Sequence, residues 1–133
     1  MEEPRIPTPR EMAILKLLWD KGPCSVKDVH RGLLNDERIG KELAYNTVQT
    51  LLRIMEDKSL VDHRLDGRTF IYAARYSREE SARSFLQRVF DGAASQFVLS
   101  LLEAEEISSE ELDRIHAMIA SARRKRLQRE TRL

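Results

Sequence analysis

The chain of 133 residues has little cysteine, glycine or aromatic content. Cys24 is the only cysteine, there are five glycines, and aromatic residues make up 6% of the total. A single cysteine excludes an intrachain disulfide and a cysteine-based metal cluster. Five glycines leave no glycine-rich phosphate-binding loop. We therefore expect a core made mostly of Leu, Ile, Val and Met, in a reducing compartment.

The chain also has no excess of positive or negative charge. Charged residues make up 34% of the total, but the net charge is only +1. Any attraction to nucleic acid must then come from a local arrangement of charges. The last segment, 123–133, "RRKRLQRETRL", is the exception, with six Arg or Lys residues and one Glu. It is either a second DNA contact or a flexible, solubilising tail.

Long hydrophobic runs are absent as well. No apolar run approaches the roughly 20 residues that a membrane-spanning helix needs. The first residues, "MEEPRIPTPRE", are acidic and proline-rich, unlike a signal peptide. We expect a cytoplasmic protein without membrane insertion.

Patterns of catalytic residues are not found. His30, His63 and His116 lie far apart, and neither a HExxH metal motif nor a serine nucleophile elbow is present. Pairs of glutamates stand near expected helix starts, where they stabilise the helix dipole. Cys24 follows a proline in a turn and is expected to be a buried thiol. We predict no enzyme, no catalytic residue, no metal site and no cofactor.

In the first 60 residues, the spacing of the apolar residues and the capping residues predict three short helices. Thr8 is a good N-cap, Pro9 suits the first helical position, and Glu11 completes a capping box. Ser25 caps the second helix. The third helix is expected over about residues 45–58.

The apolar period then changes from 3.6 to 2. The stretch "LVDHRLDGRTFIYAARY" predicts two strands joined at Asp66-Gly67, a strong hairpin signal. Three helices followed by a hairpin are typical of a winged helix-turn-helix. The predicted fold class is mainly α with a small β-hairpin wing, and residues 1–76 form the DNA-binding domain.

Residues 77–122 are expected to form three amphipathic helices, which are too few to bury all their apolar faces within one subunit. We predict a dimerisation region, with a compact monomeric helical lobe as the alternative. The expected dimerisation residues are Phe85, Val89, Phe90, Phe97, Val98, Leu101, Leu102, Leu112, Ile115 and Ile119.

The third helix has a second, polar face beside its apolar stripe. The major groove admits one helix whose polar side chains meet the base edges while its other face holds the core. Helix N-termini and a wing can add contacts to phosphates. The predicted DNA-binding residues are Ser25, Lys27, Lys41, Asn46, Thr47, Gln49, Thr50, Arg53, Arg64 and Arg68. The alternative is a winged helix that binds proteins rather than specific DNA.

Two stretches, "TPREMAILKLLWDKGPCSVKDVHRGL" and "AYNTVQTLLRIMEDKSLVDHRLDGRTFIYAA", resemble the penicillinase-repressor family of BlaI, MecI and CopY. The matching positions are Glu11, Leu15, Trp19, Val29, Thr47, Val48, Thr50, Leu51, Leu52, Leu60, Gly67, Arg68 and Tyr72. The resemblance implies a homodimer that binds a palindromic double-stranded DNA operator and represses transcription. In one branch, it also implies release by cleavage under the control of a membrane-bound sensor protease.

The chain departs from that family at three places. It has no C-terminal cysteines, which excludes copper sensing by that route. Ser100-Leu101 stands where the antibiotic-resistance branch has its Asn-Phe cleavage bond, so any cleavage must use a different bond. Ser59 replaces the usual glycine after the recognition helix, at a position that often needs a left-handed conformation, so we expect the end of this helix to differ.

Overall fold

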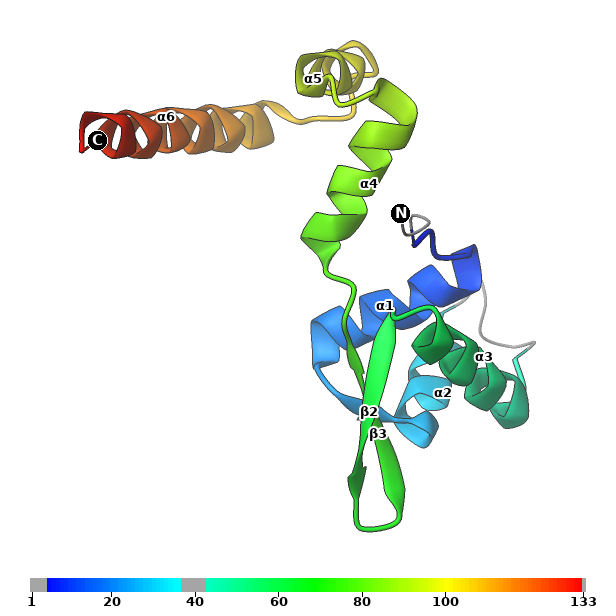
Figure 1. The fold of residues 1–133 in the computed structure, drawn as a ribbon. Coiled ribbons are helices and arrows are strands. Elements are labelled where there is room, and N and C mark those ends of the chain that lie inside the picture. The colour runs from blue at the N-terminus through cyan, green and yellow to red at the C-terminus, as the bar shows by residue number, and fades with distance from the viewer. Residues whose placement is uncertain (1–4, 37–42, 133) are drawn as a thin grey trace. The chain divides into compact units, whose positions relative to one another are not determined.

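The computed structural model describes residues 5–36 and 43–132. The chain divides into two compact units, Met1–Phe85 and Leu86–Leu133, called here the N-terminal and C-terminal units. The elements, labelled in Figure 1, are α1 (Pro9–Lys21), β1 (Cys24–Ser25), α2 (Val26–Leu34), α3 (Tyr45–Asp57), β2 (Val61–Asp66), β3 (Thr69–Ala74), α4 (Arg78–Phe90), α5 (Ala94–Glu103) and α6 (Ser109–Thr131).

The starts of α1 and α2 have the capping boxes that the sequence predicts. The Glu11 backbone N–H donates to Thr8 Oγ1 at 3.2 Å, and the Thr8 N–H donates back to the Glu11 carboxylate at 2.9 Å. Ser25 and Asp28 exchange the equivalent pair. These bonds satisfy N–H groups that a helix start otherwise leaves unpaired.

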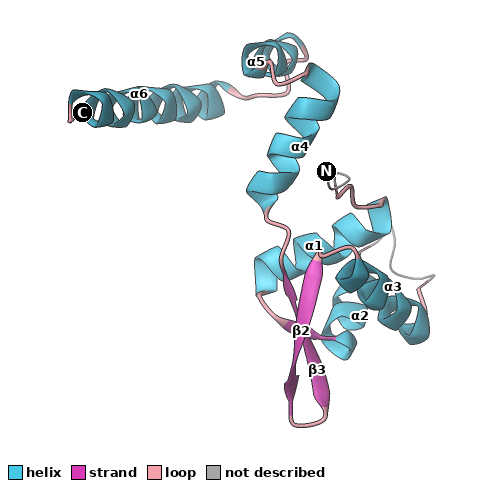
Figure 2. Cartoon of the chain, in the orientation of Figure 1, coloured by secondary structure: helices cyan, strands magenta, loops and turns pink. Residues whose placement is uncertain are grey.

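The core of the N-terminal unit lies where the apolar faces of α1, α2 and α3 meet the sheet. Figure 2 shows the three helices beside the strands. The buried hydrophobic residues are Ile14, Leu15, Leu18, Cys24, Val26, Val29, Leu33, Leu43, Val48, Leu52, Met55, Leu60, Val61, Tyr72 and Tyr76. Met12 and Trp19, expected on the same face of α1, are only partly buried. The Trp19 indole Nε1 donates to the Tyr76 carbonyl oxygen at 2.8 Å.

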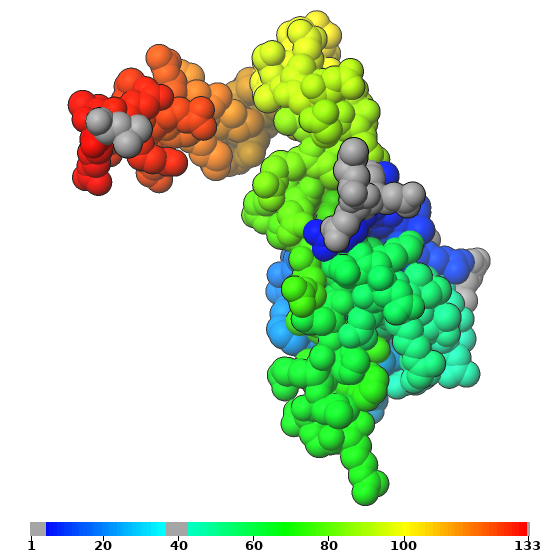
Figure 3. Space-filling model, viewed as in Figure 1, coloured from blue at the N-terminus to red at the C-terminus, as the bar shows by residue number. Residues whose placement is uncertain are grey.

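The sheet has three antiparallel strands in the order β1-β3-β2. The predicted hairpin is present, but Asp66 pairs with Thr69, so the two loop residues are Gly67 and Arg68. Gly67 adopts φ +64°, a conformation that favours glycine. Strand β1 was not predicted, because two residues are too short to show a period. In Figure 3 the hairpin projects from the helices as a narrow wing, and this topology confirms a winged helix-turn-helix.

Helix α3 ends in a left-handed conformation at Ser59, so the expectation of a different helix end is wrong. Ser59 has φ +62°. Its N–H donates to the Glu56 carbonyl, and the Leu60 N–H donates to the Met55 carbonyl at 2.9 Å. Those two bonds and the buried Leu60 side chain make a Schellman motif. A serine therefore holds a position where a glycine has less backbone strain.

One carboxylate lies inside the N-terminal unit. Glu11 is 1% exposed, and both its oxygens accept from Lys58 Nζ, at 3.0 and 3.1 Å. This ion pair joins the first turn of α1 to the end of α3. A buried carboxylate is stable only when it is paired in this way.

The C-terminal helices contrast with that core, because α4, α5 and α6 have no buried residue. Phe90 and Phe97 are in ring contact, with centroids 5.3 Å apart. Helix α6 is capped by Ser108 and continues to Thr131. The structure thus corrects the expected flexible tail: most of segment 123–133 is helical, since its Arg, Lys, Gln and Leu residues favour helix. No described helix is long and apolar enough to span a membrane.

Candidate nucleic-acid interface

Helix α3 presents two chemically different faces. Val48, Leu52 and Met55 are fully buried against the core. Asn46, Thr50 and Arg53 are exposed, while Thr47 and Gln49 are half-buried. The apolar face fixes the helix on the domain, so its polar side chains are presented from a rigid support.

A hollow of about 460 Å³, called here the α3–wing pocket, lies beside this polar face. It joins the start of α2, helix α3 and strand β3. Its lining residues are Ser25, Val26, Lys27, Tyr45, Gln49, Arg53, Arg68, Thr69, Phe70 and Tyr72. Five of them, Ser25, Lys27, Gln49, Arg53 and Arg68, were predicted as DNA-binding residues from the sequence. The structure brings these five together, although they are up to 43 residues apart (68 − 25) in the chain.

The two arginines of the wing differ in position. Arg68 is a loop residue of the hairpin and lines the α3–wing pocket. Arg64 pairs with Ile71, whereas the neighbouring cross-strand pairs are His63 with Tyr72 and Leu65 with Phe70. Because side chains alternate along a strand, Arg64 lies on the face of the ribbon opposite Phe70. Of the two, only Arg68 shares a concave surface with α3.

The cations of the α3–wing pocket are not neutralised by close carboxylates. Among the described residues, no ion pair involves Lys27, Arg53 or Arg68. The nearby Glu56 carboxylate is held by His63 Nδ1 at 2.7 Å. Three unpaired cations around one hollow favour an anionic ligand with extended charge, such as a nucleic-acid backbone.

Tyr72 forms part of the pocket lining. Burial raises the pKa of its hydroxyl group, the Glu56 carboxylate adds to the rise, and the Arg53 guanidinium opposes it. The phenol therefore stays protonated at neutral pH and adds no negative charge to the pocket.

Two predicted hydroxyl groups are already used within the protein. Thr50 Oγ1 donates to the Asn46 carbonyl at 3.0 Å, so this hydroxyl is left with only acceptor capacity. Ser25 Oγ accepts from the Asp28 N–H at 3.1 Å and keeps its own proton. Ser25 can thus still donate to a phosphate oxygen, whereas Thr50 in this rotamer cannot. Lys41 lies outside the described residues.

Five lining residues were not predicted as DNA-binding residues: Val26, Tyr45, Thr69, Phe70 and Tyr72. The Tyr45 ring packs edge-on against His30, with centroids 5.9 Å apart, and His30 Nε2 donates to the Leu43 carbonyl at 3.0 Å. Phe70 stacks on His63 at 4.3 Å. Their sequence pattern resembles that of ordinary helix-start and strand residues, so only the tertiary contacts place them at this surface.

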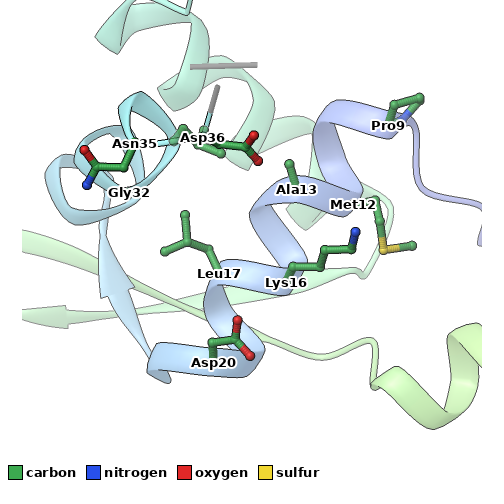
Figure 4. Close-up of a pocket in the computed structure, with 10 residues that line it drawn as sticks. Pro9, Met12, Ala13, Lys16, Leu17, Asp20, Gly32, Asn35 and Asp36 are labelled. Atoms are coloured by element: carbon green, nitrogen blue, oxygen red, sulfur yellow. The ribbon is translucent and has the colours of Figure 1, made fainter. Parts of the chain in front are cut away.

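A second hollow, of about 630 Å³, lies between α1 and α2 (Figure 4). Leu17 fills the space over Gly32, where an added Cβ would come within 2.6 Å of Leu17 Cδ1. Among the described residues that line it, Lys16 is the only cation, against Asp20 and Asp36. This balance does not favour a polyanion, and the α3–wing pocket remains the candidate nucleic-acid interface. Among residues 5–36 and 43–132, no cluster of His, Cys, Asp or Glu could hold a metal ion.

The residues predicted for dimerisation all lie on α4, α5 and α6. Phe85, Val89, Val98, Leu102, Leu112 and Ile119 are exposed large hydrophobic residues. Phe90, Phe97, Leu101 and Ile115 are half-buried. The Ser100-Leu101 bond lies within α5, and Ser100 Oγ donates to the Gln96 carbonyl at 2.9 Å.

Comparison with known proteins places these features in one family. A family model described as penicillinase repressor matches residues 7–121. The penicillinase repressor of Bacillus licheniformis is 25% identical over 113 residues, which cover 82% of this chain and 85% of that protein. The methicillin resistance regulatory protein MecI of Staphylococcus aureus (strain N315) is 20% identical over 113 residues, with 82% and 89% covered.

A solved structure agrees with the fold of the N-terminal unit. The solution structure of the DNA binding domain of the repressor BlaI is similar with a TM-score of 0.50 and 20% identity, and the match covers 60% of this chain and 93% of that one. The family model spans most of the chain, including both the winged helix and most of the helices that follow it. The chain therefore belongs to the penicillinase repressor family.

Proposed function

We propose that this protein is a transcriptional repressor that binds a palindromic double-stranded DNA operator as a homodimer in the cytoplasm. The observation that supports it best is the two-faced helix α3, buried on one side and lining a cationic pocket on the other. The names of its relatives, penicillinase repressor and methicillin resistance regulatory protein, agree with such a role.

In this proposal α3 enters the major groove. The Gln49 amide has the donor and acceptor that pair with an adenine edge, and Arg53 has the fork that pairs with guanine. Asn46, three residues before Gln49, extends the same face toward the N-terminal end of α3, and the half-buried Thr47 lies beside that face. Lys27 and Arg68, which both line the pocket, contact phosphates and set the orientation of the helix.

The homodimer follows from the exposed apolar residues of α4, α5 and α6. Large apolar patches on a chain mark surfaces that another molecule covers. A second copy is the simplest cover, because a two-fold arrangement uses the same residues on both chains. Two copies of α3 then reach successive major grooves about one helical turn apart, which explains a palindromic operator.

Release of the operator by proteolysis is the remaining part of the proposal. A membrane-bound sensor protease would be the upstream partner. The Ser100-Leu101 bond lies inside α5, and a protease needs an extended segment, so α5 must unfold locally before cleavage near this bond. The absence of a fully buried residue in α5 favours such opening.

The test begins with selection of bound sites from random DNA, followed by affinity measurements on the selected operator. Arg53→Ala and Gln49→Ala are each expected to cost about 1–3 kcal/mol and to relax specificity at one base position. Arg68→Ala should lower the affinity for all DNA sequences about equally. It should also reduce the slope of log affinity against log salt concentration by about one, the value of one phosphate contact. Arg10→Ala, at an exposed position of α1, is the matched control and should leave affinity unchanged.

Two outcomes contradict the proposal. If selection enriches no sequence and binding has no salt dependence, the winged helix is a protein-interaction module. If Arg53→Ala binds the operator as tightly as Arg10→Ala does, α3 is not the helix in the groove.

A further inference from the structure

Helix α6 has an apolar stripe that the chain itself covers only in part, since Ile115 is half-buried and the other members are exposed. Leu112, Ile115, Ile119 and Ala122 are spaced by three, four and three residues, the pattern of the first and fourth positions of a heptad. Leu112 is 39% exposed and Ile119 is 52% exposed. Figure 1 shows α6 as one uninterrupted helix, so the stripe is straight enough to meet a second helix.

We propose that the α6 helices of two copies pair antiparallel, with the two-fold axis at residue 117. This pairing, called here the α6 seam, rests on the homodimer proposed above and specifies how the copies meet. It also gives a role to the basic end of α6, which continues past residue 121, where the family match ends.

The spacing of the stripe itself defines the register. Position 117 is halfway between Leu112 and Ala122 and also halfway between Ile115 and Ile119. A two-fold axis there places Leu112 opposite Ala122 of the second copy, and Ile115 opposite Ile119 of the second copy. Every apolar residue of the stripe then meets another one, and a large residue meets a small one at both ends.

Charge complementarity favours the antiparallel direction. Glu111, Met118 and Lys125 are seven residues apart and flank the stripe on the same side. Antiparallel pairing brings Glu111 next to Lys125 of the second copy, twice in each dimer. Arg126 and Arg129, which continue the stripe, extend past Ser109, the first residue of α6 in the second copy, and so do not meet each other in the interface.

A parallel pair has the opposite electrostatics. It would place Arg126 against Arg126 and Arg129 against Arg129 of the second copy, at the centre of the interface. Like charges at such positions destabilise the pair and select against that orientation. The cations from Arg123 to Arg132 have no ion pair with the described part of the chain, so they are available to the second copy.

Distances between spin labels test the register. Single cysteines at Asp113, Ala117, Arg124 and Gln128, on the outer side of α6, are introduced in a Cys24→Ala background and labelled. In an antiparallel pair the axial separation of equal labels grows by about 3 Å for each residue away from 117. The distance should be shortest at Ala117 and should increase toward Asp113 on one side and Gln128 on the other.

The alternatives give different distance profiles. Equal distances at all four positions mean a parallel pair and overturn the seam. A dimer whose distances have no minimum at Ala117 means that α6 packs on other helices of the second copy, which overturns the seam but leaves the homodimer. A chain that stays monomeric at all concentrations overturns both.

Charge reversal gives an independent test by sedimentation. Glu111→Lys places two like-charge contacts in the dimer and should raise the dimer Kd on the order of tenfold. Adding Lys125→Glu to the same chain should restore the affinity, because the pair is re-formed with the charges exchanged. Glu110→Lys, one residue away on the outer side, is the control. If it weakens the dimer as much as Glu111→Lys does, the seam is wrong.

Discussion

The N-terminal and C-terminal units have similar apolar side chains but bury them very differently. Every strand and helix from α1 to β3 contributes at least one side chain to a shared core. In contrast, α5 and α6 have no buried residue, although Val98, Leu102 and Ile119 are as hydrophobic as the core residues of α3. The N-terminal unit closes its core within one chain, whereas α4, α5 and α6 leave large hydrophobic side chains exposed, the feature on which the proposed homodimer rests.

Because of this difference, the stability of the two units should depend differently on protein concentration. A core that closes within the chain has a free energy of unfolding that does not depend on concentration. Helices that bury their faces only on association gain stability by mass action. Trp19, the single tryptophan, lies in the N-terminal unit, so its fluorescence reports that unit alone.

The largest contrast is expected between two leucine-to-alanine substitutions. Leu52→Ala removes a fully buried side chain of α3 and should lower the free energy of unfolding by about 2–5 kcal/mol. Leu102→Ala, at a position that is 44% exposed, should change it by less than about 0.5 kcal/mol in dilute protein. Urea unfolding measures both, followed by Trp19 fluorescence for Leu52→Ala and by far-UV circular dichroism for Leu102→Ala. Equal losses would show that Leu102 is buried within its own chain.

The ion pairs of the two units provide the next contrast. Lys58→Met leaves the buried Glu11 carboxylate with only its bond to the Thr8 N–H, and should cost about 2 kcal/mol. Arg114→Met removes an exposed i,i+3 partner of Glu111 in α6 and should cost at most about 0.5 kcal/mol. Urea unfolding of Lys58→Met, and far-UV circular dichroism of Arg114→Met, check the two values. A large loss for Arg114→Met would contradict the view of α6 as an exposed helix.

Alkaline pH should weaken the N-terminal unit through two buried groups that are partners in the sheet. Burial raises the pKa of the Cys24 thiol, with a further rise from Asp28 and an opposing effect of Lys21. Burial also raises the pKa of Tyr72. The unfolded chain then releases these protons at a lower pH than the folded one does.

The sign of the pH effect follows directly. The stability is fully present below the ordinary pKa of about 8.5 for a thiol and falls as the pH rises above it, by at most about 1.4 kcal/mol per pH unit for each group. Unfolding curves between about pH 7.5 and pH 10.5 measure the slope. Cys24→Ala should reduce the slope of the free energy of unfolding against pH at the lower end of this range, where the thiol titrates. An unchanged slope in that variant would assign the effect to other groups.

The smallest expected effect concerns left-handed residues at helix ends. Ser59→Gly relieves the strain of φ +62° but increases the entropy of the unfolded chain, so a net gain of about 0.5 kcal/mol is expected. Asp91, with φ +51° near the end of α4, is the matched position, and Asp91→Gly should gain less because Asp tolerates this conformation better. Thermal unfolding of both variants compares them. A loss of stability in Ser59→Gly would mean that the serine side chain makes a contact worth more than the strain.

Much of the N-terminal unit could be predicted from local sequence signals. Thr8 and Glu11 marked one helix start and Ser25 another, since capping uses residues only three positions apart. The two-faced pattern of α3 predicted both its buried residues and its polar face. The end of α3 was not predicted correctly, because the serine at position 59 indicated a different helix end, whereas the backbone keeps the left-handed conformation with a serine.

Features that depend on distant contacts escaped the sequence analysis. Glu11 was predicted as a capping residue, but nothing near it indicated that it would be buried against Lys58, 47 residues later. Tyr45 and Phe70 reach the α3–wing pocket only through their packing on His30 and His63. The two-residue strand β1 exists because β3 supplies its hydrogen bonds.

The sequence by itself determined the elements, their order and the family resemblance, because caps, turn residues and apolar periods act within a few residues. The tertiary structure decided which predicted cations share a surface: Arg68 joins Gln49 and Arg53 at the α3–wing pocket, while strand alternation turns Arg64 to the other face. It also showed that no residue of α4, α5 or α6 is fully buried, although some of their apolar side chains are half-buried. Pairing in a sheet and burial in a core depend on residues far apart in the chain, and local patterns do not contain that information.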